Sequence, residues 1–451
     1  MGEGARTEGH CVLTRPFVVL WVSMLVAMAG ISMVSPLLPV HVQDDLGGPP
    51  LAVALSFSGL SIAQIIGAPF VGRLGDLFGP KRFIVIGFAI YSAGAMGYLF
   101  APTWELVIFF RVLSGVGAAA VFPMSLAYIG RMSPPGGEGR YMGWFAVAQT
   151  GGFGIGPLFG GGLRDAFGSD AAFATMALLL GGAALLTLIG LPSERSLRPV
   201  DDAPDRDASS QANAESVPTV APIEEVVPYR VLLRDPAVLG ATLLVLLIGA
   251  SWGSAAAWLA VFVIDAEGLG TNSALFAGVL LSSRQLLSAT LQPFTGALAD
   301  RTNRVALVAV GLVISGAAQF AIPLVPRSLV DTSILGAAMT MAPWVLVAML
   351  VAGVAESLAT PAQQAIFVQI GRRGGMGSLM GLNAMGNATG FLGGSLIGAL
   401  VKDVLGIDAV FSMAGIVTIA GAAIFVVLMG RARAATTDFA PPRTDRAELL
   451  R

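Results

Sequence analysis

Long apolar stretches alternate with short polar connections along most of the chain. Each stretch has enough apolar residues to cross the hydrocarbon core of a bilayer as a helix, which takes about 20 residues. Unpaired backbone groups are costly in lipid, so the stretches predict helices and not open strands. The twelve predicted spans are residues 17–40, 49–71, 83–101, 105–129, 141–163, 171–191, 237–264, 272–296, 305–326, 341–367, 375–400 and 406–429.

The second six spans repeat the pattern of the first six. The sequence Gly-Arg-Leu-Gly-Asp at 72–76 follows the second span, and Gly-Ala-Leu-Ala-Asp at 296–300 follows the eighth, at an offset of 224. Further along the offset becomes 238, as between Gly115 and Gly353, which predicts a longer loop around 327–341. The repeat predicts an all-α membrane fold of two six-helix bundles, related by a pseudo-twofold axis along the membrane normal.

Polar segments divide the chain into five parts. The longest is rich in Pro, Asp, Ser and Ala and has too few apolar residues to fold alone, which predicts a flexible linker; a small folded domain is the alternative. We expect a cytoplasmic N-terminal segment at 1–16, an N-terminal bundle at 17–191, the cytoplasmic linker at 192–234, a C-terminal bundle at 235–430 and a cytoplasmic tail at 431–451.

Composition and charge agree with a membrane protein. Of 451 residues, 55% are hydrophobic and 12% are charged, whereas soluble domains average about 25% charged residues. One cysteine and two histidines exclude a disulfide framework and a Cys/His metal cluster. With both termini in the cytoplasm, 21 of the 26 lysines and arginines fall on the cytoplasmic side, as the positive-inside rule requires.

Three motifs lie on or beside these spans. The first reads Gly-x-Leu-x-Asp-x-x-Gly-x-Lys-Arg over 72–82 and has a partial copy over 296–304. The second, Arg-x-x-x-Gly-x-Gly over 111–117, places an arginine inside the fourth span. The third leaves one face of the fifth span nearly free of side chains, so that a neighbour packs closely, and bends the helix at its proline. Its residues are Gly143, Gly152, Gly156, Pro157, Gly160 and Gly161.

On these motifs the chain resembles the major facilitator superfamily, and within it the twelve-helix exporters similar to drug:proton antiporters. The resemblance implies that the first motif and its copy form a lock between the halves in the outward-open state; an ordinary polar turn is the alternative. The lock residues would be Gly72, Asp76, Lys81, Arg82, Gly296, Asp300 and Arg301. The chain departs from the family at Leu77 and Pro80, where the family has basic residues.

The same resemblance implies a role for Arg111 in proton coupling. The alternative is an arginine that reaches the outer surface, where Glu105 would neutralise it. The third motif implies an exporter coupled by antiport. Its second-half copy has Ser395 where Pro157 stands, so we expect the two halves to bend differently.

Glu356 is the acidic residue that falls deep inside a predicted span. Near the bilayer midplane a lone carboxylate is costly, so it should be neutral, paired or in contact with a central cavity. Arg284, near the middle of the eighth span, is its natural partner. We predict that Glu356 carries the proton and that Arg284 or Arg111 tunes it; a static structural ion pair is the alternative.

The first span contains no acidic residue, although many drug:proton exporters carry one there. Two arginines and one glutamate inside the spans indicate a neutral or mildly positive cavity, for neutral, amphiphilic or anionic substrates. For each predicted cavity residue the alternative is a contact between helices. These residues are Gln64, Gln149, Gln285, Gln292, Asn383, Asn387, Trp252 and Trp258, with methionines as adaptable lining.

Together these features predict a secondary active transporter that exports a small amphiphilic or drug-like compound by proton antiport and alternating access. A lipid or glycolipid translocator, a siderophore or sugar exporter, an importer and a non-transporting membrane sensor are the alternatives. The sequence has no Gly-Lys-Ser/Thr phosphate loop, so we expect neither ATP drive nor a cofactor, and we expect no enzyme. The expected partners of a monomer in the plasma membrane are a small-molecule or lipid substrate, protons and membrane lipids, with no nucleic acid.

Overall fold

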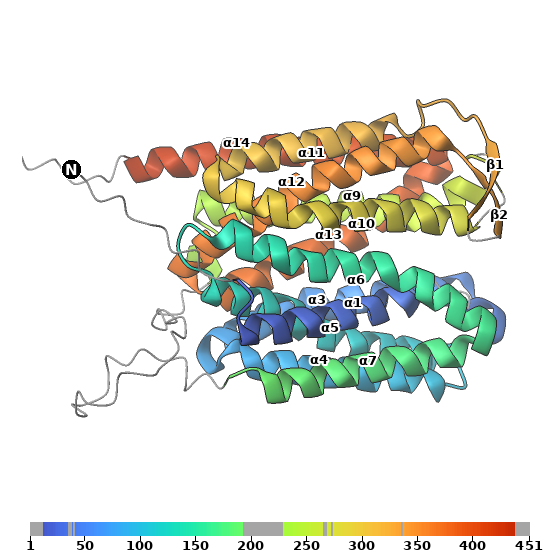
Figure 1. Cartoon of the computed structure of the whole chain (residues 1–451), viewed down its shortest axis with the longest axis horizontal. Coiled ribbons are helices and arrows are strands. Elements are labelled where there is room, and N and C mark those ends of the chain that lie inside the picture. Colours follow the sequence, from blue (N-terminus) through green and yellow to red (C-terminus); the bar gives the residue numbers. More distant parts are fainter. Residues whose placement is uncertain are drawn as a thin grey trace, which may run out of the picture.

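Long helices in two bundles make up the structure, a computed structural model that describes residues 12–34, 38, 41–192, 229–264, 268–271, 274–334 and 337–437. In Figure 1 the two bundles lie side by side with their helices along the long axis. The first bundle, from blue to green, holds α1 (Arg15–Val34), the short π-helical turn η1 (His41–Asp45), α3 (Pro50–Phe78), α4 (Pro80–Leu99), α5 (Trp104–Met132), α6 (Glu138–Phe167) and α7 (Ser169–Gly190). We call it the N bundle.

The second bundle, from yellow-green to red, is the C bundle. It holds the short α8 (Tyr229–Leu232), α9 (Pro236–Ile264), α10 (Ala274–Arg301), α11 (Arg304–Ala321), the strands β1 (Val330–Ile334) and β2 (Ala337–Met341), α12 (Pro343–Gly374), α13 (Met376–Leu405) and α14 (Ile407–Thr437).

Nine of the described helices are long and apolar enough to cross a membrane. The other long helices, α3, α6 and α10, have 29, 30 and 28 residues. Each of these three packs against the opposite bundle. Large apolar side chains such as Phe70, Leu178 and Ile189 are 69–71% exposed on the outside of the bundles, where lipid would surround them.

Small residues repeat the same helix packing in both bundles. A Cβ on Gly87 of α4 would lie 2.9 Å from the carbonyl oxygen of Gly117 in α5. A Cβ on Gly311 of α11 would lie 2.6 Å from the carbonyl oxygen of Ala355 in α12. The offsets between these positions are 224 and 238, so the repeat in the sequence is a repeat in space. The structure thus confirms the predicted pair of pseudo-symmetric bundles.

Glycines also bring the two bundles together at one end. A Cβ on Gly72 of α3 would lie 3.1 Å from Gly381 Cα of α13, and one on Gly296 of α10 would lie 2.9 Å from Gly143 Cα of α6. This end carries the turns at 133–137 and 302–303, and we call it the linker end; it lies at the left in Figure 1. The opposite end carries β1 and β2, and we call it the hairpin end.

Two segments differ from their prediction. The loop expected around 327–341 forms an antiparallel hairpin, in which Val330 pairs with Met341 and Ile334 with Ala337. The tail expected from 431 begins as helix, because α14 continues to Thr437.

The predicted linker 192–234 lies mostly outside the described residues, but its last part forms α8. The Tyr229 hydroxyl of α8 donates to the Pro69 carbonyl of α3. Burial raises the pKa of Tyr229 to about 12, so the hydroxyl keeps the proton that it donates. The start of the C bundle is thereby attached to the N bundle at the linker end.

Candidate functional site

A buried ion pair joins α10 and α12 near the middle of each helix. Arg284 Nε donates to Glu356 Oε2 at 3.1 Å. Gly353, one turn before Glu356, explains how α12 comes so close, because a Cβ there would lie 2.6 Å from the Arg284 carbonyl oxygen. Arg284 is 8% exposed and the side chain of Glu356 is 20% exposed, so the pair is largely removed from the surface. The structure brings these two predicted residues together; their role in proton coupling stays a prediction.

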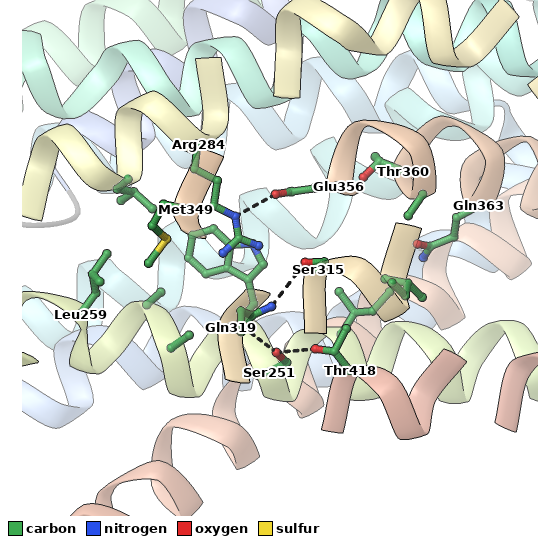
Figure 2. A pocket seen from close by; sticks show the side chains of 17 residues that line it. Ser251, Leu259, Arg284, Ser315, Gln319, Met349, Glu356, Thr360, Gln363 and Thr418 are labelled. Atoms are coloured by element: carbon green, nitrogen blue, oxygen red, sulfur yellow. Dashed lines mark hydrogen bonds and ion pairs between the residues drawn. The ribbon is translucent and has the colours of Figure 1, made fainter. Parts of the chain in front are cut away.

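A cavity of about 70 Å³ lies beside this pair, inside the C bundle (Figure 2). We call it the C-bundle pocket. Apolar side chains form much of its lining, including Trp252, Leu259 and Met349. Arg284 and Glu356 face the pocket, so water or a ligand in it is in contact with the ion pair.

Hydrogen-bonded side chains from α9, α11 and α14 form the other side of the pocket (Figure 2). Thr418 Oγ1 donates to Ser251 Oγ at 2.7 Å, and Ser251 Oγ donates to Gln319 Oε1 at 3.1 Å. Gln319 Nε2 in turn donates to Ser315 Oγ at 3.4 Å. We call these four residues the polar wall. Sequence reasoning did not predict this wall, because each member is a lone polar residue on an apolar helix.

One aromatic contact crosses from the N bundle to the pocket. Phe153 of α6 packs edge-on against Trp252 of α9, with ring centroids 5.7 Å apart and an interplanar angle of 85°. Because Trp252 lines the pocket, this contact connects α6 of the N bundle to the pocket wall.

Arg111 lies apart from this site, within the N bundle. It is 5% exposed, and its Nε donates to the Ser56 carbonyl at 2.8 Å. The Tyr98 hydroxyl, which pairs with Ser114 Oγ at 3.0 Å, also interacts with Arg111. Among the described residues no carboxylate forms an ion pair with Arg111. Burial rules against the alternative of a guanidinium that reaches the outer surface, and the structure does not bring Arg111 to Glu356.

At the linker end Asp76 of α3 binds the beginning of α13. Its carboxylate oxygens accept from the backbone N–H groups of Gly377 and Ser378, both at 2.6 Å. Arg131 Nη2 donates to the same carboxylate at 2.9 Å. A carboxylate at a helix N-terminus satisfies free N–H groups and interacts favourably with the helix dipole. Asp76 therefore holds the two bundles together.

Asp300 of α10 makes the equivalent contact with the beginning of α6. It accepts from the backbone N–H groups of Gly139 at 2.7 Å and Arg140 at 2.8 Å. Arg304 Nη2 donates to Asp300 at 2.8 Å and to Glu138 at 2.8 Å. The carboxylate of Glu138, 1% exposed, also pairs with Arg372 at 2.8 Å. This contact thus has a second carboxylate and a second arginine, which the described residues around Asp76 do not provide.

Gly72 and Gly296 lie at these two contacts, next to Gly377 and Gly139, whereas the basic residues of the predicted lock lie outside them. Lys81 donates to the Leu191 carbonyl at 2.5 Å, within the N bundle. Arg82 and Arg301 are exposed. The basic side chains that bind the two aspartates are Arg131 and Arg304, which the motif does not single out.

The glycines of the third motif pack mainly within the N bundle. A Cβ on Gly152 would lie 2.8 Å from the Met28 Cβ of α1, and one on Gly156 would lie 2.9 Å from the Met33 backbone nitrogen. Gly160 also faces Met33, whereas Gly143 faces α10. The bare face of α6 thus holds α1, and its linker-end part touches the opposite bundle. Pro157 lies within α6, and the surroundings of Gly161 are outside the described contacts.

Of the predicted cavity residues, Trp252 lines the C-bundle pocket. Gln149 pairs with Gln364 of the opposite bundle at 3.4 Å, and Gln292 donates to Thr150 at 3.1 Å, so these amides join α6 to the C bundle. Trp258 lies under the Lys402 ammonium, 5.0 Å from the ring centroid. The others lie on inter-bundle helices: Gln64, Gln285 and Asn383 are buried and Asn387 is exposed.

Known transporters resemble parts of this chain. It is 34% identical over 155 residues to an uncharacterized MFS-type transporter of Methanocaldococcus jannaschii, a match that covers 34% of this chain and 40% of the relative. It is 30% identical over 167 residues to multidrug resistance protein 2 of Bacillus subtilis (36% and 41% covered). It is 28% identical over 153 residues to the quinolone resistance protein NorA of Staphylococcus aureus (34% and 39% covered). The matched part spans about two fifths of the length of these relatives.

Comparison of whole structures and of family patterns covers more of the chain. The human organic anion transporter MFSD10 superimposes with a TM-score of 0.70 at 17% identity, over 91% of this chain and 99% of that one. At this identity the likeness concerns the fold. The sequence pattern of the Major Facilitator Superfamily matches residues 20–333 and 272–451. Both results agree with the paired bundles and apolar helices described above. The chain therefore belongs to the Major Facilitator Superfamily of multi-pass membrane transporters.

Proposed function

We propose that this transporter is a secondary active exporter that exchanges protons for a small amphiphilic compound. The Arg284–Glu356 pair beside the C-bundle pocket carries this proposal. Glu356 is the membrane-embedded carboxylate of the described helices that faces a cavity and a cation at once. In a medium of low dielectric, the charge of such a carboxylate decides whether the neighbouring cation is neutralised.

Protonation of Glu356 would convert the ion pair into a neutral acid beside a free guanidinium. Deprotonation would restore the pair. Each proton thus changes the hydrogen bonding and the charge on one side of the pocket, where the compound would bind. A carrier that must be either protonated or loaded before it changes conformation exchanges the two species across the membrane.

The linker-end contacts would supply the gate. Asp76 and Asp300 each bind the beginning of a helix in the opposite bundle, so the linker end is closed in this structure. We propose that this end faces the cytoplasm, with both termini there, and that the contacts break when the bundles rock to expose the site to the cytoplasm.

The names of the relatives guide the choice of compound. Multidrug and quinolone resistance proteins are among them, which supports export of drug-like molecules. The first helix, α1, has no acidic residue in its first turn, and none occurs over 15–34. A fixed negative charge for a cationic drug is therefore missing from α1, which supports a neutral or weakly charged compound.

Glu356→Gln tests the proposal in proteoliposomes that contain the full chain. With an imposed pH gradient, the wild-type protein is expected to accumulate a fluorescent drug-like dye at a rate that depends on the gradient. The Gln variant keeps the shape of the side chain but holds no exchangeable carboxyl proton, so its residual flux should no longer respond to pH. Glu105→Gln, at an exposed position of α5, is the matched control. An unchanged pH response in Glu356→Gln would show that another group carries the proton.

A further inference from the structure

The polar wall of the C-bundle pocket has no part in the proton exchange proposed above. Ser251, Ser315, Gln319 and Thr418 are each 3–4% exposed. Buried polar side chains in a membrane bundle cost free energy unless they are well paired, and an apolar residue of similar size packs at no such cost. Packing alone therefore does not explain why these four positions are polar.

The N bundle shows what packing alone requires at these positions. Gln319 of α11 corresponds to Ala95 of α4 at the offset of 224, and Ala95 is fully buried. Thr418 of α14 corresponds to Leu180 of α7 at the offset of 238, and Leu180 is fully buried too. The same backbone arrangement is thus stable with apolar side chains at these two positions, whereas Ser315 corresponds to the buried Tyr91.

The α9 member of the wall gives the same result. Gly152 and Gly156 pack against Leu25 and Ala29 of α1 as Gly390 and Gly394 pack against Leu246 and Ala250 of α9. This places α1 and α9 at an offset of 221, at which Ser251 corresponds to Gly30. Even the ion pair lacks an N-bundle counterpart, because Arg284 corresponds to Leu60 and Glu356 to Ala118. Among the described residues, the ion pair and three of the four wall residues have no polar counterpart at the equivalent positions of the N bundle.

The wall retains unused hydrogen-bonding capacity toward the pocket. Gln319 accepts one hydrogen bond at Oε1 and donates one from Nε2. An amide has two acceptor lone pairs and two donor hydrogens, so one of each remains. The cavity of about 70 Å³ is large enough for several water-sized groups, each of which needs about 10–15 Å³. A ligand that carries both a donor and an acceptor would fit this wall.

The charge of the pocket selects the kind of ligand. Arg284 and Glu356 neutralise each other at 3.1 Å, so a charged ligand would have to break this pair or stay uncompensated in a buried site. We propose that the C-bundle pocket is a subsite for the neutral, hydrogen-bonding end of the exported compound, an amide or hydroxyl group. The apolar lining at Trp252, Leu259 and Met349 would hold its aromatic or aliphatic body. This inference rests on the proposed function, since it names the substrate class of the same site.

Equilibrium binding to the purified full chain in detergent tests the subsite, with no pH gradient. Two radiolabelled probes are compared: chloramphenicol, a neutral aromatic molecule with an amide and two hydroxyl groups, and tetraphenylphosphonium, a cation without hydrogen-bonding groups. Gln319→Leu should weaken chloramphenicol binding about tenfold and Ser315→Ala about threefold, as expected for lost hydrogen bonds. Tetraphenylphosphonium should bind more weakly than chloramphenicol to the wild type, because the Arg284–Glu356 pair leaves no net negative charge for a cation, and its affinity should change in neither variant.

Thr187→Val is the matched control. Thr187 of α7 is fully buried and bonds to Ser23 of α1 at 3.1 Å, as Thr418 of α14 bonds to Ser251 of α9, but it lies away from the pocket. Its chloramphenicol affinity should equal that of the wild type. The subsite is wrong if the wild type shows no saturable chloramphenicol binding, if both wall variants bind it normally, or if the control loses as much affinity as they do. Binding without proton-dependent flux would instead contradict the antiport and leave the subsite standing.

Discussion

The N bundle and the C bundle share their backbone packing and differ in their buried charge. In the N bundle Arg111 is held by the Ser56 carbonyl and the tyrosine–serine pair, with no described carboxylate beside it. In the C bundle Arg284 meets Glu356 beside a cavity. The position that corresponds to Arg111 in the C bundle is Met349, which lines this cavity.

The shared packing residues serve the fold, whereas the buried charges that differ between the bundles are the candidates for transport. Glycines and alanines recur at equal offsets because the distance between helices depends on them. Asp76 and Asp300 recur as well, at the contact between the bundles, whereas Arg284, Glu356 and Arg111 inside the bundles have no charged counterpart at the equivalent positions. The buried charges are therefore better guides to chemistry than the motifs that recur in both bundles.

The largest expected effect comes from breaking the pair in the C bundle. Arg284→Met leaves Glu356 buried without its cation, which should lower the free energy of unfolding by about 3–5 kcal/mol. Arg111→Met removes a cation with no carboxylate partner, so the loss should be about 1–2 kcal/mol, the size of a hydrogen bond to a charged group. Denaturant unfolding in mixed micelles measures both. Equal losses would mean that the two arginines are held in the same way.

Recovery of stability on neutralising both partners is the control for this comparison. The double variant Arg284→Met with Glu356→Gln should regain most of the stability that Arg284→Met loses, because no buried charge is left unpaired. Additive losses would contradict the assignment of the pair as the main interaction of both residues.

A smaller effect is expected at the linker end. Asp76→Asn keeps the size of the side chain but loses its charge. Among the described residues Arg131 is the ion-pair partner of Asp76, so the closed state should lose about 2 kcal/mol. Asp300→Asn should cost about 1 kcal/mol, because Arg304 still pairs with Glu138. Distances between spin labels on the two bundles at the linker end, measured by double electron–electron resonance, report the fraction of molecules in which this end is open. A larger opening in Asp300→Asn would overturn the assigned role of Glu138.

The smallest effect is expected from the exposed motif arginines. Arg82→Ala and Arg301→Ala should each change the free energy of unfolding and the open fraction by less than about 0.5 kcal/mol, as surface substitutions usually do. The same two unfolding and distance measurements apply. If the linker end opened in either variant, the arginine concerned would hold the two bundles together, as the motif predicts.

Sequence reasoning reached the parts of the molecule that depend on local pattern. Apolar length predicted the long helices, and the repeated glycine offsets predicted the paired bundles, because both are patterns along the chain that need no knowledge of contacts in space. The cost of a charge in lipid was enough to single out Arg284 and Glu356, which the structure places 3.1 Å apart.

The parts that sequence reasoning missed depend on distant residues that meet in space. Glu138 and Arg372 read as ordinary charges at helix ends, and only the approach of the two bundles buries them together. Gln319 and Thr418 appear in the sequence as single polar residues on apolar helices. They form one wall because α11 and α14 both present these side chains to the same pocket, where each bonds to Ser251. The hairpin at 330–341 was expected as a loop, since its mixed pattern is too short to identify pairing strands.

The edge-on contact of Phe153 with Trp252 gives the protein a built-in optical reporter. Indole emission shifts with the polarity around the ring, and here one ring is shielded by an aromatic residue of the opposite bundle. When α6 moves away from α9, water would reach Trp252 and its emission would move to longer wavelength. The chain has six tryptophans, so a variant in which the other five are replaced by Phe would let Trp252 emission follow the working cycle without an added label.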